Sequence, residues 1–348
     1  MRRSVSIVAV LLLATAGFLY QTRLSGELPG VRDMFPLLCG LSLFAVVGLA
    51  FANGRIRVLL ACPWAYYALS VVLLAALIVF GHRYRGGVYL PGRINPSEFV
   101  KLLFVIFAAG YMHKVHYKFG MLTLRSIAAL GIAFCVLAAE IAVLHDFGLL
   151  AQLGLTLTVM VFAASWLWGI MAVAGVSATV LIVAAKPMGH LAKRFAVWRD
   201  PFADMTGAGW QTLQGLAALV SGGWWGKGIG MGEVHAVPIV SSDFVYVALA
   251  EEVGFAGCVF LMVLWLLFLS MSLLPHIRGL STRELSLQGQ GVVLLTVGLV
   301  ASLGIQIALN VAGVLNALPM TGITLPLLSH GGSSLIAVLA MCGLLCTE

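Results

Sequence analysis

The stretch Val237 to Gly254, VPIVSSDFVYVALAEEVG, contains the carboxylate that is best placed to take part in a reaction. Asp243 stands directly before a long apolar run, and Glu251 and Glu252 follow a little over two helical turns inside that run. Partial burial raises the pKa of a carboxyl toward a value that suits a general base. A helix cap explains Asp243 as well, because a carboxylate there accepts hydrogen bonds from backbone amides. The spacing alone leaves both interpretations open.

Two further elements place charged side chains at the ends of apolar runs. In NPSEFVK, Glu98 and Lys101 are three residues apart, so they share one helical face and favour an ion pair. That pair either fixes two helices together or has a function, since ionisable side chains inside a span are functional candidates. In LHDFGLL, Asp146 either caps a helix or orients an arginine or a substrate hydroxyl.

The segment NVAGVLNALPMTGITLPLLSHGGSS combines two prolines with four glycines near the last apolar run. Broken backbone at membrane depth is tolerated only where protein or a watery cavity satisfies its polar groups. Ser329, His330 and the amides of Gly331 and Gly332 are then placed to donate hydrogen bonds to an anion near the start of the last span. The alternative is a simple turn outside the membrane.

The composition specifies the surroundings of these residues. Of the 348 residues 61% are hydrophobic and 9% are charged, and the mean hydropathy is +1.06, so polar side chains are too few to coat a soluble domain. The apolar runs are long and unbroken, which favours spanning helices over the alternating strands of a barrel. We therefore predict an all-α fold, a polytopic membrane helical bundle formed by residues 1–348 as a single domain.

The apolar runs divide at charged or glycine- and proline-rich joints into about ten transmembrane spans. The longest segment between spans, from about Lys186 to Asp243, is predicted to form a long outer loop between spans seven and eight. This loop includes a glycine-bounded apolar stretch that is too short to cross a membrane. The predicted spans centre near Leu12, Ser42, Ser70, Phe104, Phe134, Thr156, Ser177, Phe260, Val300 and Leu339.

Positive charge in the loops predicts the orientation of the bundle. The positive-inside rule assigns the loops that contain Arg55, Arg57, Lys114 and Lys118 to the cytoplasm, together with both chain ends. The opposite face is more positive than usual, which indicates either loop solvation or anion binding. A formal net charge of +7 does not indicate nucleic-acid binding, because no soluble basic domain carries it, and anionic lipid is the better partner. The cations of the outer face are Arg83, Arg85, Arg93, Lys186, Lys193, Arg194, Arg199 and Lys227.

Together these segments resemble the shape, elongation, division and sporulation family of polytopic membrane proteins. The matching segments, in the family's order, are NPSEFVK, HDFG, KRFAVWRDPFADMTGAGWQTLQGLAALVSGGWWGKGIGMG, PIVSSDFVYVALAEEVGFAG and LPMTGITLPLLSHGGSS. They run from about Arg85 to the last span, so the resemblance covers most of the chain. Several motifs in the right order are a far more specific signal than any one of them.

The resemblance implies a multi-pass protein of the bacterial cytoplasmic membrane, with ten spans and both termini in the cytoplasm. It implies a peptidoglycan glycosyltransferase that polymerises lipid II, a polyprenyl pyrophosphate-linked disaccharide, on the outer face. It also implies a class B penicillin-binding protein as partner, and Asp243 as the catalytic residue. With the patterns above, it predicts substrate-binding roles for Arg85, Glu98, Lys101, Asp146, Arg194, Ser329 and Gly331.

The chain departs from the family where Ile239 to Ser242 replace the usual Glu-x-His-Thr, and where His145 and His330 replace a proline and a tyrosine. Two other functions therefore stay open: a transporter or flippase for the same lipid, and a non-catalytic scaffold for the transpeptidase. The sequence shows no metal-ligand cluster, although a pyrophosphate substrate leaves a divalent cation open. Cell division and elongation also stay open.

Overall fold

The computed structural model describes most of the chain, in segments separated by short gaps. The described residues are 2–25, 31–51, 55–84, 87–92, 94–119, 122–165, 168, 171, 175, 189–207, 209–233, 242–281, 287–329 and 331–347. Arg85, His330, residues 239–241 and most of the predicted span around Ser177 lie outside them.

The described residues are largely helical, as predicted, with one small hairpin in addition. The long helices are α1 (Arg2–Ser25), α2 (Val31–Ala50), α3 (Pro63–Phe80), α4 (Ser97–Phe119), α5 (Leu124–Leu144), α6 (Phe147–Ala164), α10 (Val245–Ser281), α11 (Leu287–Val314) and α12 (Gly332–Leu345). The shorter elements are η1 (Arg55–Leu60), α8 (Gly189–Arg199), η2 (Pro201–Asp204), α9 (Trp210–Gly222), β1 (His82–Tyr84) and β2 (Gly87–Tyr89). The antiparallel pair of β1 and β2, in which Arg83 faces Val88, was not predicted from the sequence.

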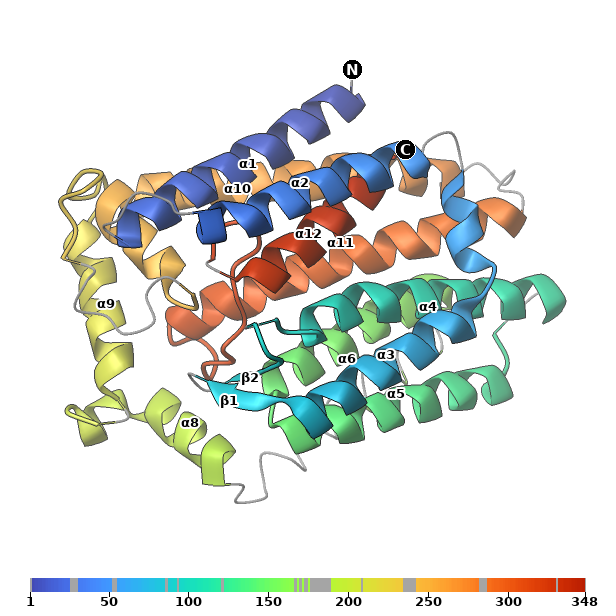
Figure 1. The fold of residues 1–348 in the computed structure, drawn as a ribbon, viewed down its shortest axis with the longest axis horizontal. Helices are drawn as coiled ribbons and strands as arrows, with labels where there is room; N and C mark the ends of the chain where they lie inside the picture. Colours follow the sequence, from blue (N-terminus) through green and yellow to red (C-terminus); the bar gives the residue numbers. More distant parts are fainter. Residues whose placement is uncertain are drawn as a thin grey trace.

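The long helices lie side by side in one bundle (Figure 1). Among the described elements, α4 packs against α3, α6 and α11, whereas α12 packs against α2 and α10 packs against α9. The hairpin, α8 and α9 lie at one end of the bundle, and both chain ends lie on the side away from α8 and α9 (Figure 1). We call the end that carries α8 and the hairpin the loop end.

The described helices account for most of the predicted spans. Seven of them are long and apolar enough to cross a membrane, and they fall within α1, α3, α4, α5, α6, α10 and α11. Two shorter apolar helices, Met34–Ala50 and Gly332–Leu345, coincide with the predicted second and tenth spans. Most of the predicted seventh span lies outside the described residues, so the total number of spans stays a prediction.

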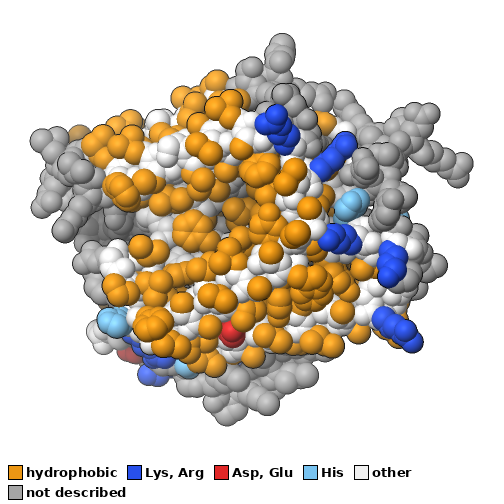
Figure 2. Space-filling model, turned by 45° about the vertical axis from the view of Figure 1, so that its right-hand side comes forward, with side chains coloured by type: hydrophobic (Ala, Val, Ile, Leu, Met, Phe, Trp, Pro, Cys, Tyr) orange, Lys and Arg blue, Asp and Glu red, His pale blue; other side chains and the backbone are white. Residues whose placement is uncertain are grey.

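The outer surface of the bundle suits a lipid environment. Figure 2 shows a broad apolar band across one face, with Lys and Arg side chains gathered along one edge of it. Exposed apolar residues such as Leu69, Val72, Val79 and Ile132 contribute to the lipid-facing surface of α3 and α5. A bundle without water on its flanks keeps its backbone polar groups paired inside helices, so the irregular segments collect at the ends.

The elements of the loop end follow from their residue types. The glycine-bounded apolar stretch forms α9, which is too short to span and packs along the start of α10. The proline- and glycine-rich segment between α11 and α12 is non-helical over much of its length, with Gly322 at φ 76°. We call residues 315–331 of this segment the crossing loop.

Candidate active site

A pocket of about 590 Å³ opens at the loop end of the bundle. Residues from the hairpin, α4, the α5–α6 junction, α8, α9, the crossing loop and the start of α12 line it. Segments far apart in sequence therefore contribute to one cavity, as expected when several helices end at the same level. Of the predicted site residues within the described part of the chain, those that line the pocket are Glu98, Lys101, Asp146, Arg194, Asp243 and Gly331.

Asp243 lies two residues before the first residue of α10, where the chain reaches the pocket. Its backbone carbonyl accepts a hydrogen bond from the Asn310 side chain at 3.0 Å, and the carbonyl of Ser242 accepts one from the Ser329 hydroxyl at 2.6 Å. The carboxylate is thus presented by a backbone that is fixed from α11 and from the crossing loop. This fixation distinguishes Asp243 from a mobile loop carboxylate.

The surroundings of Asp243 favour its protonated form. Burial raises the pKa of Asp243 to about 6, against the opposing effects of a hydrogen bond from the Ser242 hydroxyl and of the nearby Arg194 guanidinium. The negative charges of Asp146 and Glu98 add to the rise. A carboxyl with this pKa is ionised at neutral pH and still basic enough to accept a proton, which is the property of a general base.

Arg194 extends from α8 to the crossing loop. Its guanidinium donates to the backbone carbonyls of Met320 and Thr321, both at 3.1 Å. A Cβ atom at Gly322 would lie 3.7 Å from an Asp243 carboxylate oxygen and 3.9 Å from an Arg194 nitrogen, so the two side chains flank this glycine. The two carbonyls therefore fix the arginine beside the aspartate and within the pocket.

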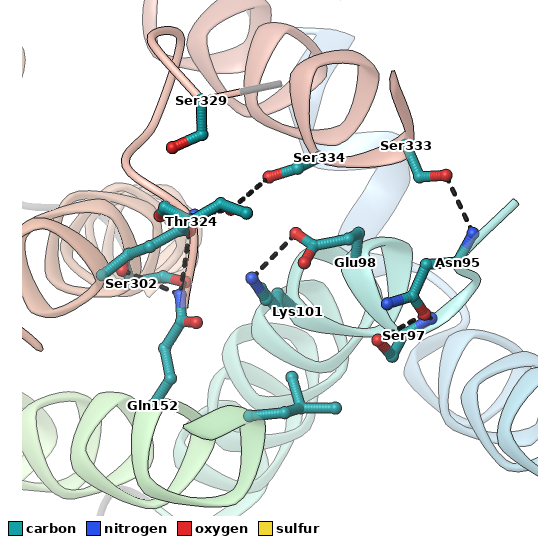
Figure 3. Close-up of polar contacts among 12 residues, drawn as sticks. Asn95, Ser97, Glu98, Lys101, Gln152, Ser302, Thr324, Ser329, Ser333 and Ser334 are labelled. Carbon is teal, nitrogen blue, oxygen red and sulfur yellow. Dashed lines mark hydrogen bonds and ion pairs between the residues drawn. The ribbon is translucent and has the colours of Figure 1, made fainter. Parts of the chain in front are cut away.

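The Glu98–Lys101 ion pair predicted from the sequence is present at 2.8 Å. The lysine side chain is 4% exposed, and the pair lines the pocket below Thr324 and Ser334 (Figure 3). Asn95 supports the start of α4, because its side-chain oxygen accepts hydrogen bonds from both the amide and the hydroxyl of Ser97. The pair is thus part of the cavity as well as a contact within one helix.

Asp146 has the capping role predicted from the sequence, and its predicted role in orienting an arginine or a substrate hydroxyl stays a prediction. Its carboxylate caps α6 by accepting the Leu149 amide at 3.0 Å, and it also lines the pocket. Burial raises the pKa of Asp146, whereas the Leu149 amide and Lys101 act in the opposite direction. The cap hydrogen bond fixes the orientation of the carboxylate relative to the other charges.

Ser329 and Gly331 have structural contacts that the sequence did not predict. The Ser329 hydroxyl accepts the Leu325 amide at 2.7 Å and donates to Ser242, and Ser329 does not line the pocket. The Gly331 amide donates to the Ser329 carbonyl at 3.0 Å, so this donor is already paired within the crossing loop. The predicted binding roles of these two residues stay predictions.

Three amide side chains of the spans were missed by sequence reasoning. Asn310 also donates to Ile323, Gln306 donates to the Thr324 carbonyl, and Gln152 donates to Gln306 and Ser302. Figure 3 shows this polar chain passing from α6 through Thr324 to Ser334 at the start of α12. The available signal was the presence of polar residues inside otherwise apolar spans, which marks function or packing by default.

No group of three or more His, Cys, Asp or Glu side chains in the described part of the chain is arranged to bind a metal ion. Arg85, predicted to bind an anionic substrate, lies outside the described residues.

The sequence has clear relatives. A family profile described as cell cycle protein, covering FtsW, RodA and SpoVE, matches residues 4–347. The probable peptidoglycan glycosyltransferases FtsW of Aliivibrio salmonicida and Aeromonas salmonicida are 28% and 30% identical, over 95% and 90% of this chain and 82% and 81% of their own. The peptidoglycan glycosyltransferase RodA of Mycobacterium tuberculosis is 33% identical over 71% of this chain, which spans about half, 54%, of that relative.

Solved structures agree on the fold. RodA of Thermus thermophilus, a rod shape determining protein, is 25% identical and matches with a TM-score of 0.63 over 98% of this chain and 94% of its own. A chain from a study of polymerization and crosslinking by a peptidoglycan synthase complex matches with a TM-score of 0.75 at 24% identity, over 98% and 96%. The resemblance drawn from the motifs is confirmed: the chain belongs to the FtsW, RodA and SpoVE family of cell cycle proteins.

Proposed function

We propose that this chain is a peptidoglycan glycosyltransferase that polymerises lipid II into glycan strands. Family membership and the names of the curated relatives support the reaction class. The observation that carries the proposal is the Asp243 carboxyl, with its pKa raised to about 6, inside a pocket that also contains Arg194 and Lys101. A base and two cations in one cavity suit a reaction that releases a proton and a pyrophosphate.

Asp243 acts as the general base in this proposal. Its carboxylate accepts the proton of the acceptor sugar hydroxyl, whose oxygen forms a bond to the anomeric carbon of the donor sugar. The bond from that carbon to the pyrophosphate oxygen breaks, and its electron pair leaves with the polyprenyl pyrophosphate. A positioned base contributes about 100- to 10,000-fold to such a rate.

The cations of the pocket stabilise the leaving pyrophosphate. Lys101, Lys193 and Arg194 line the cavity, and charge-assisted contacts to phosphate strengthen where water is excluded. The start of α12 also meets the pocket, and helix N-termini favour anions. Binding of the pyrophosphate by Arg85 stays a prediction. A divalent cation brought by the substrate itself also stays a prediction.

We place the pocket on the outer face of the bacterial cytoplasmic membrane, with both termini in the cytoplasm. Arg55, Arg57, Lys114 and Lys118 lie in η1 and toward the end of α4, away from the pocket, and the positive-inside rule favours that side for the cytoplasm. A class B penicillin-binding protein is the partner that we propose from family membership. That partner would cross-link the strands made here.

Polymerisation of lipid II by the purified protein tests this function, with and without its proposed partner. We expect Asp243→Ala to lower the rate by about 100- to 10,000-fold while leaving insertion and helix content intact. Asp204→Ala removes an exposed carboxylate from η2 at the same end of the bundle and serves as the matched control.

A wild-type rate in the Asp243→Ala protein would contradict the assignment. Movement of lipid II across liposome membranes that survives this substitution, without any glycan product, would support transport instead.

A further inference from the structure

Helix α10 is broken at Gly254, two residues after its pair of glutamates. Gly254 has φ 70° and ψ −175°, which is not helical, and it separates the segment 245–253 from the rest of the helix. The break lies within the apolar span Val245–Pro275. Backbone groups released by a break in a span must find partners inside the protein, because lipid offers none.

The segment that follows α9 provides those partners. Its backbone runs along the break and forms hydrogen bonds on both sides of Gly254. Two bonds go from the segment to carbonyls before the break, and two come from amides after it. The four bonds are Lys227 to Glu251 at 2.9 Å, Gly228 to Glu252 at 3.0 Å, Phe255 to Gly223 at 2.9 Å and Ala256 to Trp224 at 3.1 Å.

Two ion pairs, each between a buried carboxylate and a partly exposed cation, reinforce the same place. The Glu251 carboxylate accepts the Lys227 ammonium at 2.6 Å and the Ser221 hydroxyl at 3.2 Å, and the Glu252 carboxylate accepts the Arg23 guanidinium at 2.9 Å. Both glutamate side chains are 3% exposed. Each carboxylate thus joins α10 to another element, the end of α9 in one case and the end of α1 in the other.

Close backbone approach makes the fit specific. A Cβ atom at Gly226 would collide with the Glu252 carbonyl, and one at Gly254 would collide with the Gly226 amide. Both glycines also have positive φ angles, 77° and 70°, which other residues rarely adopt. We call residues 223–228, with Glu251, Glu252 and Arg23, the clasp.

The clasp has a direct geometric relation to Asp243. The helical segment 245–253 lies between the two, about 14 Å long at the rise of an α-helix. Asn310 and Ser329 fix the backbone at its pocket end, and the clasp fixes its other end. The segment is therefore held at two points, and release of the clasp would leave it held only at its pocket end.

We propose that Glu251 and Glu252, with Lys227 and Arg23, are positioning residues that set the place of Asp243 in the pocket. The proposal rests on the proposed function for its rate measurements. These four residues do not line the pocket, so they act through the 245–253 segment and not through the substrate.

Lys227→Met and Glu251→Gln test the clasp in the full-length protein, by hydrogen exchange and by lipid II polymerisation. We expect faster exchange at the amides of Lys227, Gly228, Phe255 and Ala256. We also expect kcat to fall by about 10- to 100-fold with KM nearly unchanged, because a displacement of about 1 Å is enough for such a loss. Lys227→Arg keeps the positive charge and should retain most of the rate.

Arg55→Met is the matched control, since it removes a cation from η1, which does not line the pocket. Arg23→Met, at the more exposed ion pair, repeats the test if the first variants fold poorly. Faster exchange at the four amides without loss of rate would overturn the proposal, as would unchanged exchange in both first variants. A wild-type protein that does not polymerise lipid II would instead overturn the proposed function, and the exchange measurement would still report on the clasp.

Discussion

Two acidic regions, one just before α10 and one within it, differ in how their charge is compensated. Asp243, two residues before the helix, lines the pocket and forms no ion pair with any described cation, although Arg194 lies nearby. Glu251 and Glu252, about two turns into the helix, are almost fully buried and each pairs with a cation at 2.6 Å or 2.9 Å. Acidic side chains therefore occur in a reactive setting just before α10 and in a structural one within its first segment.

The difference lies in what each carboxylate can still do. A paired carboxylate has its charge compensated, and withdrawing one partner leaves a buried charge that is strongly destabilising. Asp243 keeps its negative charge only partly compensated, which is why burial raises its pKa to about 6. Such a group can take up a proton from a substrate, whereas the clasp carboxylates serve to fix backbone.

The largest expected effect is on polymerisation, and it separates the two regions directly. Asp243→Asn keeps the shape of the side chain and removes its basicity, so we expect a loss of about 100- to 10,000-fold in kcat. Glu251→Gln should cost no more than about 100-fold, because it acts only through position. Steady-state rates for the two variants in one assay check this ranking. Equal losses would contradict the distinction between a catalytic Asp243 and a positioning Glu251.

Arg194 provides the next test, because its guanidinium flanks Gly322 together with the Asp243 carboxylate and lowers the pKa of that carboxyl. We expect Arg194→Met to lower kcat by about 100-fold, as removal of one charged donor from a pocket typically does. Its loss also removes an influence that lowers the pKa of Asp243, so the pH of half-maximal rate should rise. Arg194→Lys, which keeps the charge but not the two-pronged contact with the crossing loop, is the control. An unchanged rate in Arg194→Met would show that the arginine has no role in the reaction.

For thermal stability we expect Asp243→Asn and Glu251→Gln to act in opposite directions. A raised carboxyl pKa stabilises the fold at low pH and loses that stabilisation as pH rises from about 4 to about 6. For Asp243 the cost at neutral pH is about 3 kcal/mol, since each pKa unit is worth about 1.4 kcal/mol. Asp243→Asn should therefore raise the thermal midpoint at pH 7 and leave it unchanged below about pH 4. Glu251→Gln should lower the midpoint, and a common direction for both variants would contradict the comparison.

The smallest effect is expected at Ser329. Ser329→Ala removes the hydroxyl that joins Leu325 to Ser242, and one hydrogen bond is worth about 1 kcal/mol net. We expect a few-fold loss of kcat with no change in its pH dependence. The measurement is the same polymerisation assay, with Ser302→Ala as a control whose hydroxyl accepts from Gln152 deeper in the bundle. A loss as large as that of Arg194→Met would indicate a direct role in binding.

Local patterns predicted the parts of the site that depend on nearby residues. The Glu98–Lys101 pair follows from a spacing of three on a helix, and the Asp146 cap follows from its place between two apolar runs. The spans followed from hydropathy in the same way. Each of these features is fixed by residues a few positions apart.

Contacts between distant segments were out of reach of the same patterns. Asn310 is 67 residues from Asp243, and Lys227 is 24 residues from Glu251. No local sequence pattern predicts that these pairs are in contact. The break at Gly254 likewise depends on hydrogen bonds from residues 223–228, which are distant in the sequence. The β1–β2 hairpin was missed because its strands are only three residues long.

The dependence of the polymerisation rate on pH tests the role of Asp243 most directly. A general base must be ionised, so kcat/KM of the wild-type protein should fall about tenfold per pH unit below an apparent pKa of about 6. The residual rate of Asp243→Asn should lack this limb. A wild-type rate that stays constant from about pH 5 to about pH 8, or an identical limb in Asp243→Asn, would contradict the assignment of Asp243 as the base.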